Sequence, residues 1–256
     1  MDLETVRVER RDGIAIVSLA RPDEHNALTP VMNSELTFVA HSLASDPSVG
    51  AAVLRGDGSD FSVGADLNAC LPVILDGTND ERRSMLQQAY DWVFAFASFP
   101  KPLVTAVRGI VAGSGVSMTA LGHFRLAASD TIFYPAFTQL GLVGDCGFMH
   151  LLPPLIGTPR TRELLSFRKS LDVDTAYAWG FVSSIVGAAD LDDSAIRAAR
   201  TAASVPAATW AACEELLARA DPGTLQADLE RELTSQLVLL ASPQFAQRLN
   251  ELRDRR

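Results

Sequence analysis

The sequence predicts a mixed α/β domain followed by an all-helical segment. Over roughly the first 190 residues, short apolar runs alternate with helical periods, so that a pattern of strand, strand and helix recurs. Two of the apolar runs end in glycine-rich loops, which allow positive φ angles and close approach of the backbone to another group. After Asp190 the periodicity is helical only. We therefore divide the chain into a core domain, residues 1–190, and a C-terminal helical segment, residues 191–256.

The first half of the core is predicted to open with a β-hairpin. Residues 6–10 and 14–19 read as strands on either side of a turn at Arg11-Asp12-Gly13. A loop follows, and Thr29 then caps a helix that begins at Pro30 and runs roughly to residue 42. Residues 51–54 read as a buried strand and residues 80–98 as a helix. Residues 71–79, between them, show no clear period, and we expect a mobile segment there.

The second half of the core alternates in the same way. The expected strands are residues 103–107, 125–128, 131–134 and 181–186, with a turn at Ser129-Asp130 between the second and third. The expected helices are residues 116–121, 148–156, 160–167 and 174–179. The C-terminal segment is predicted to contain helices at residues 193–203, 206–220, 223–240 and 243–253. Leucines spaced by three and four residues in the third of these require a partner surface.

Composition and charge exclude several classes of protein. The formal net charge of −9 argues against nucleic acid or an anionic membrane as a partner, although an anionic small ligand needs only a few local basic groups. Three cysteines lack metal-ligand spacing and suit a reducing compartment without disulfides. The sequence shows no signal-peptide pattern and no apolar run long enough to span a bilayer. We expect a cytoplasmic protein without a metal site.

Two glycine-rich loops are the best candidates for a functional site. Residues 55–67 follow the strand at residues 51–54, and Gly113-Ser114-Gly115 follows the strand that ends at Val107. Two strand ends that pass into such loops can aim two backbone N–H groups at one point. That is the geometry that an oxyanion requires.

The order and spacing of these motifs resemble the enoyl-CoA hydratase/isomerase (crotonase) superfamily. The resemblance covers nearly the whole chain and rests on Asn26-Ala27-Leu28 and on residues 61–67, 107–109, 113–115, 140–145 and 178–182. It implies the ClpP/crotonase-like fold, a spiral of repeated ββα units whose C-terminal helices cover the site and build homotrimers, often paired into homohexamers. It also implies an acyl-CoA substrate of the kind met in fatty acid metabolism, with coenzyme A as part of the thioester and no permanently bound cofactor.

The resemblance assigns the oxyanion hole to the backbone N–H groups of Ala65 and Ser114. Many members of the superfamily have glycine where Ser114 stands, but a backbone donor survives that change. The substrate-binding positions implied by the same motifs are Arg21, His25, Val63, Ala65, Asp66, Leu67 and Gly113. Among them, Arg21 and His25 flank a loop that approaches the CoA phosphates in the superfamily, and Asp66 is expected to fix its loop rather than act as a base.

The acid–base residues depart from the hydratase pattern. Hydratases of the superfamily carry two glutamates, and the matching positions here are Ser117 and Phe137. Asp145 remains, at about the place of the single catalytic glutamate of enoyl-CoA isomerases and of an aspartate in aroyl-CoA dehalogenases and naphthoyl-CoA synthases. Asp145 is therefore a candidate proton shuttle or nucleophile. Its apolar sequence neighbours predict a raised affinity for its proton. The alternative is that Asp145 only caps a helix beginning at Cys146.

These observations predict an enzyme that stabilises the enolate of an acyl-CoA thioester and transfers a proton with Asp145, as in double-bond isomerisation. Two alternatives stay open at this point. One is an enoyl-CoA hydratase, a lyase, with a remodelled base. The other is a non-catalytic acyl-CoA-binding protein.

Overall fold

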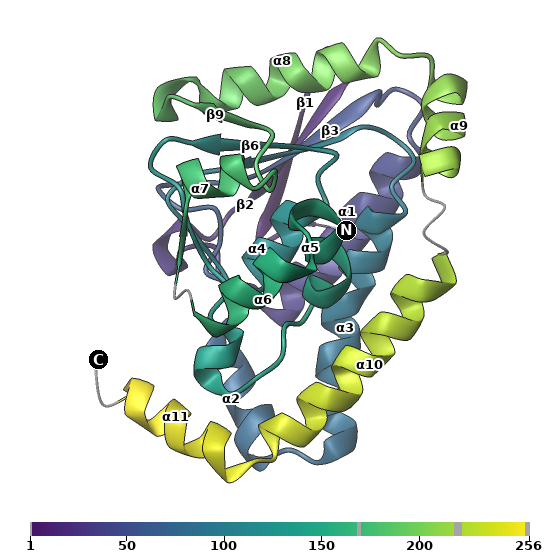
Figure 1. Ribbon diagram of the computed structural model, residues 1–256. Helices are drawn as coiled ribbons and strands as arrows, with labels where there is room; N and C mark the ends of the chain where they lie inside the picture. Colours follow the sequence, from purple (N-terminus) through teal and green to yellow (C-terminus); the bar gives the residue numbers. More distant parts are fainter. Residues whose placement is uncertain (1, 168–169, 218–221, 254–256) are drawn as a thin grey trace.

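A six-stranded sheet forms the centre of the fold in the computed structural model, which describes residues 2–167, 170–217 and 222–253 (Figure 1). The strand order is β1-β2-β3-β4-β6-β9. The strands are β1 (Val6–Arg11), β2 (Ile14–Leu19), β3 (Ala51–Gly56), β4 (Leu103–Val107), β6 (Phe124–Ala128) and β9 (Ser184–Val186). The β1–β2 hairpin is antiparallel, as predicted, and every later pair in this sheet is parallel.

A second, three-stranded sheet has the order β5-β7-β8, with β5 (Ile110–Ala112), β7 (Ile132–Tyr134) and β8 (Leu171–Asp172). Consecutive strands therefore alternate between sheets: β4 and β6 belong to the first, and β5 and β7 to the second. The predicted turn at Ser129-Asp130 carries the chain from one sheet to the other. Repetition of this step, with helices in between, gives the expected crotonase-type spiral.

Helices cover both faces of the large sheet. On one face, α1 (Pro30–Ser45) packs against α3 (Asn79–Ala97); on the other, α8 (Leu191–Ala203) lies across β3, β4 and β6 (Figure 1). The buried residues of β3 alternate accordingly, as the period of two in a strand requires. Ala52 and Leu54 belong to the main core cluster, whereas Ala51 and Val53 belong to the cluster beneath α8.

The segment predicted to be mobile is helical in its first part. The helix α2 runs over Leu67–Asp76, and the Asp66 carboxylate caps it by accepting hydrogen bonds from Asn68 N (3.1 Å) and Ala69 N (3.2 Å). Only Cys70 and Ile74 are buried, and Pro72 lies inside the helix. The sequence showed no helical period here because two inward residues in ten are too few to show one.

The remaining helices of the core are short. They are α4 (Ser114–Ala120), α5 (Phe148–Ile156), α6 (Thr158–Ser166) and α7 (Val173–Ala178), with short 3-10 turns η1 (Pro22–Glu24), η2 (Phe137–Leu140) and η3 (Ala188–Asp190). The predicted helices in this part are confirmed to within a few residues.

The C-terminal segment continues with α9 (Ala207–Leu217), α10 (Pro222–Leu240) and α11 (Pro243–Arg253). Residues 218–220, predicted to end the helix that starts at residue 206, lie outside the described residues. The helix α10 packs on α3 and α5, and its buried Leu229, Leu233 and Leu240 belong to the main core cluster. Throughout the described ranges, the helices fall short of the combined length and hydrophobicity that crossing a membrane requires.

Candidate active site

The two glycine-rich loops lie directly against each other. Gly64 has a φ of +83°, and a Cβ atom at that position would lie 2.8 Å from Ala112 O and 3.1 Å from Ser114 N. Both the backbone angle and the close approach therefore require glycine. The neighbouring backbone holds the loops in register, since Ala112 N donates to Ser62 O over 2.8 Å.

Two backbone N–H groups at this junction are free. Within the described part of the chain, neither Ala65 N nor Ser114 N donates a hydrogen bond to protein. Ser114 is the first residue of α4, so its N–H has no partner inside the helix. Gly113 precedes it with φ 53° and ψ −126°, a conformation suited to glycine. Two free donors on facing loops can hold the oxygen of a carbonyl group as it gains negative charge.

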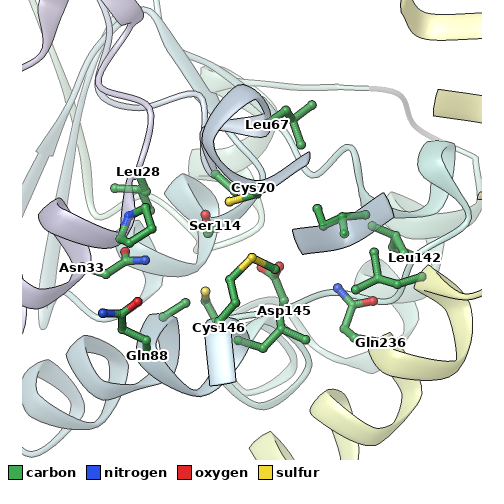
Figure 2. Close-up of a pocket in the computed structure, with 17 residues that line it drawn as sticks. Leu28, Asn33, Leu67, Cys70, Gln88, Ser114, Leu142, Asp145, Cys146 and Gln236 are labelled. Atoms are coloured by element: carbon green, nitrogen blue, oxygen red, sulfur yellow. The ribbon is translucent and has the colours of Figure 1, made fainter. Parts of the chain in front are cut away.

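Both residues line a cavity of about 100 Å³, shown in Figure 2. The helices α1, α2, α3 and α10 supply most of its wall, which is largely apolar. The apolar lining residues are Leu28, Pro30, Leu67, Ile74, Met85, Leu86, Ala89, Leu142 and Leu240. The polar lining residues are few: Asn33, Gln88, Ser114, Asp145 and Gln236, with the thiols of Cys70 and Cys146.

Among the described residues that line this cavity, Asp145 is the only one with a carboxylate. Its Oδ1 is buried and has no hydrogen-bond partner among the described residues. Burial away from water raises the pKa of Asp145 to about 6, while the Cys146 thiol and the Gln236 amide lower it in part. The Ser117 hydroxyl donates to Asp145 O over 2.9 Å and fixes the backbone of this loop. The carboxylate is thus held in the cavity with one oxygen free for a ligand.

The capping interpretation of Asp145 is wrong. The helix α5 begins at Phe148, and its N-cap residue, Gly147, provides no side-chain cap. Glu232 of α10 takes that role: its Oε2 accepts from Gly147 N (3.1 Å) and its Oε1 from Met149 N (3.0 Å). Burial raises the pKa of Glu232 to about 8, although these two hydrogen bonds act in the opposite direction.

Ser117 and Phe137, which the resemblance matches to the two hydratase glutamates, have structural contacts. Both are buried. The Phe137 ring packs edge-on against the Phe148 ring, with 5.2 Å between the ring centroids. Neither side chain is a carboxylate that could orient water, and the match of these two positions to the hydratase glutamates stays a prediction.

Several of the loop residues predicted to bind the substrate join the loop after β2 to the loop after β3. Arg21 Nη1 donates to Ala27 O (2.6 Å) and to Asp66 Oδ2 (3.1 Å), so that Asp66 fixes its loop as expected. Val63 N donates to His25 O over 3.1 Å. The His25 side chain is more than half exposed, with its Nδ1 2.8 Å from Asp60 Oδ2. Contact of Arg21 and His25 with coenzyme A stays a prediction.

Neither thiol of the cavity is poised as a nucleophile. Burial raises the pKa of Cys70 to about 11 and that of Cys146 well above its ordinary value. In the described ranges, no group of three or more His, Cys, Asp and Glu residues is arranged to hold a metal ion.

Four polar residues near the cavity escaped sequence reasoning: Gln88, which is half-buried, and three more deeply buried residues, Asn33, Glu232 and Gln236. Glu232 and Gln236 follow Leu229 by three and seven residues and thus share the inward stripe of α10. Asn33, Glu232 and Gln236 are all at least nine-tenths buried. A polar residue on an otherwise apolar helix stripe is the sequence signal that could have identified Glu232 and Gln236.

The comparisons with known proteins agree with this fold. The family model described as Enoyl-CoA hydratase/isomerase matches residues 9–247. The chain belongs to this family, which confirms the resemblance seen in the sequence.

Two curated relatives and one solved structure show the range of the family. The chain is 28% identical over 250 residues to 4-chlorobenzoyl coenzyme A dehalogenase-2 of Arthrobacter sp., covering 98% of this chain and 91% of the relative. It is 30% identical over 223 residues to 1,2-epoxyphenylacetyl-CoA isomerase of Escherichia coli K12, covering 86% and 85%. A crystal structure of an enoyl-CoA hydratase from Mycobacterium avium subsp. paratuberculosis K-10 superposes with a TM-score of 0.86 at 28% identity, covering 97% and 98%. By their names, all three proteins process CoA thioesters.

Proposed function

We propose that this protein is an acyl-CoA thioester enzyme that moves a proton on the carbon chain beside the thioester, as in double-bond isomerisation. One observation carries the proposal: a carboxylate oxygen without a partner, on Asp145, shares a compact cavity with the free N–H groups of Ala65 and Ser114. Coenzyme A enters as part of the substrate, and no permanently bound cofactor takes part.

The proposed reaction starts at the thioester carbonyl. Its oxygen accepts hydrogen bonds from Ala65 N and Ser114 N. Ionised Asp145 then removes a proton from the carbon next to the carbonyl, and the two electrons of that C–H bond form the enolate. The two N–H groups stabilise the oxygen as its negative charge grows. In a 3-enoyl thioester this enolate is conjugated with the β,γ double bond. Asp145, now protonated, returns the proton to the γ carbon; the two electrons of the β,γ double bond form the new C–H bond, the enolate electrons form the α,β double bond, and the carbonyl re-forms.

The properties of Asp145 suit this role. A pKa of about 6 leaves the carboxylate ionised at neutral pH and makes it a stronger base than an exposed aspartate. The apolar wall and the absence of carboxylates at Ser117 and Phe137 argue against activation of water, and so against the hydratase alternative. The free oxygen of Asp145 also fits attack on an acyl group, and the similarity to a dehalogenase makes this nucleophilic role the second candidate.

Hydrogen exchange tests proton removal without knowledge of the physiological substrate. The purified protein is incubated with butanoyl-CoA in D₂O, and mass spectrometry follows deuterium entering the acyl group. The proposal expects exchange that depends on protein and falls by at least about 100-fold in Asp145→Asn. Equal exchange in both proteins would overturn it.

Two further measurements separate the alternatives. Calorimetry with butanoyl-CoA and with butanoic acid should detect binding of the thioester only. Binding of the thioester without exchange would identify a non-catalytic acyl-CoA-binding protein. Release of chloride from 4-chlorobenzoyl-CoA would identify the nucleophilic role instead.

A further inference from the structure

Asn33 places an amide in the apolar wall of the cavity. The residue belongs to the first turns of α1, is only 8% exposed and lines the cavity. Figure 2 shows Asn33 with Gln88 on one side of the cavity and Asp145 with Gln236 on the other. The cavity is therefore polar at a place away from the proposed base.

The fold makes no use of this amide. The Asn33 side chain forms no hydrogen bond with any described residue, and its Oδ1 is buried without a partner. Asn26, which is also buried, gives the contrast: its Nδ2 donates to Asp57 O (2.8 Å) and Asp60 O (2.9 Å), and its Oδ1 accepts from Arg21 N (2.9 Å). Asn26 holds loops together, whereas Asn33 keeps its hydrogen-bonding capacity for something that enters the cavity.

A second side-chain amide, that of Gln88, lies on the same side of the cavity as Asn33. Gln88 of α3 lines the cavity, and its Nε2 donates to Ser34 Oγ on α1 over 3.1 Å. This bond ties α3 to the residue that follows Asn33 and fixes the position of the Gln88 side chain. Two amides from neighbouring helices thus lie together in a wall that is otherwise mostly aliphatic.

We propose that Asn33 binds a hydroxyl substituent on the acyl group of the substrate, so that the protein prefers hydroxylated acyl-CoA thioesters over unsubstituted ones. A hydroxyl group satisfies the amide in both directions, since its O–H donates to Oδ1 and its lone pairs accept from Nδ2. A hydrocarbon group would leave the amide oxygen buried and unpaired.

This inference rests on the proposed acyl-CoA function, and binding measurements test it without turnover. Calorimetry compares butanoyl-CoA with 3-hydroxybutanoyl-CoA and 4-hydroxybutanoyl-CoA, and phenylacetyl-CoA with (4-hydroxyphenyl)acetyl-CoA. We expect at least one hydroxylated ester to bind about 10-fold more tightly than its unsubstituted counterpart. In Asn33→Leu the preference should fall below about twofold, while the unsubstituted esters bind as tightly as before or more tightly.

A matched variant controls for the exchange of asparagine for leucine. Asn250 is exposed on α11, outside the cavity, so Asn250→Leu should keep the full preference. Thermal unfolding distinguishes a binding role from a structural one. If Asn33 had a structural role, Asn33→Leu would have a lower melting temperature than the wild type. Because Asn33 makes no bond that the fold needs, Asn33→Leu should be at least as stable as the wild type.

Each contrary result has its own meaning. Equal affinity for hydroxylated and unsubstituted esters in the wild type, as expected if water already satisfies Asn33, overturns the inference. So does a preference that survives in Asn33→Leu, or a variant that is destabilised and thereby shows a structural role. Absence of binding to every CoA ester would instead overturn the proposed function, and the inference with it.

Discussion

Replacement of Asp145 by asparagine separates catalysis from stability. The change keeps the size of the side chain and removes its charge. General acid–base catalysis contributes typically about 10²–10⁴-fold, so kcat of Asp145→Asn should fall by roughly that factor on any substrate that the wild type converts. Affinity for CoA esters should change little, because the oxyanion donors are the backbone N–H groups of Ala65 and Ser114.

The same variant should be more stable than the wild type at neutral pH. Burial raises the pKa of Asp145 from 3.8 to about 6. One pKa unit corresponds to about 1.4 kcal/mol, so the ionised carboxylate costs the folded state at most about 3 kcal/mol above pH 6. Asparagine has no such penalty, and the gain in free energy of unfolding approaches that figure.

The sign of the pH dependence follows from the direction of the pKa shift. Between pH 3.8 and about 6 the folded protein binds more protons at Asp145 than the unfolded chain does. The wild type therefore loses stability relative to Asp145→Asn as the pH rises through this window, and the difference is constant above it. Catalysis by the ionised base follows the opposite trend, and kcat/KM should rise with pH through about 6.

Urea denaturation of both proteins at pH 5 and pH 8 measures the first effect, and turnover over the same range measures the second. Two results would refute the reasoning. Unchanged turnover in Asp145→Asn would remove Asp145 from the mechanism. A variant less stable than the wild type at pH 8 would show that the carboxylate has a structural partner.

Three further predictions concern α10, the missing glutamates and the assembly. Glu232→Ala should lower the free energy of unfolding by about 1–3 kcal/mol in urea denaturation, because Gly147 N and Met149 N lose their acceptor; no change would disprove the capping role. Because burial raises the pKa of Glu232 from 4.5 to about 8, it also contributes a fall in stability as the pH rises through that window, which Glu232→Gln should reduce. With Ser117 and Phe137 at the hydratase positions, hydration of crotonyl-CoA should be far slower than about 10 s⁻¹; a faster rate would reveal a different base. Light scattering should give three or six times 27.5 kDa, and a monomer would contradict the proposed trimeric or hexameric assembly.

Most elements of the fold were predictable because their signals are local. The strands β2, β3 and β4 are apolar runs of five or six residues, and α1 and α3 extend over several turns. The strands β5 and β8 were missed because three and two residues are too few to show alternation. Each of these two strands exists because it pairs with β7. β8 is distant from β7 in the sequence, so no local pattern marks that pairing.

In the candidate site too, features with a local sequence signal were predictable and features that depend on long-range contacts were not. The glycine loops were predictable, since Gly64 and Gly113 adopt positive φ angles for which the sequence gives a direct signal. The environment of Asp145 was not, because its neighbours come from elsewhere in the chain. Glu232 lies 85 residues beyond Gly147, whose N–H it accepts, and no local pattern links the two. In the sequence, Asn33 is indistinguishable from any other polar residue of a helix. Only its burial in the cavity wall makes it a candidate for binding the substrate.

The closure of the cavity by α10 has a consequence for biosynthesis. Leu28 and Pro30, which line one part of the wall, leave the ribosome long before Gln236 and Leu240, which line another part. The apolar surface of α3 that α10 covers must stay uncovered until α10 has been made. In a nascent chain, acquisition of the proposed acyl-CoA binding would therefore report that α10 has docked.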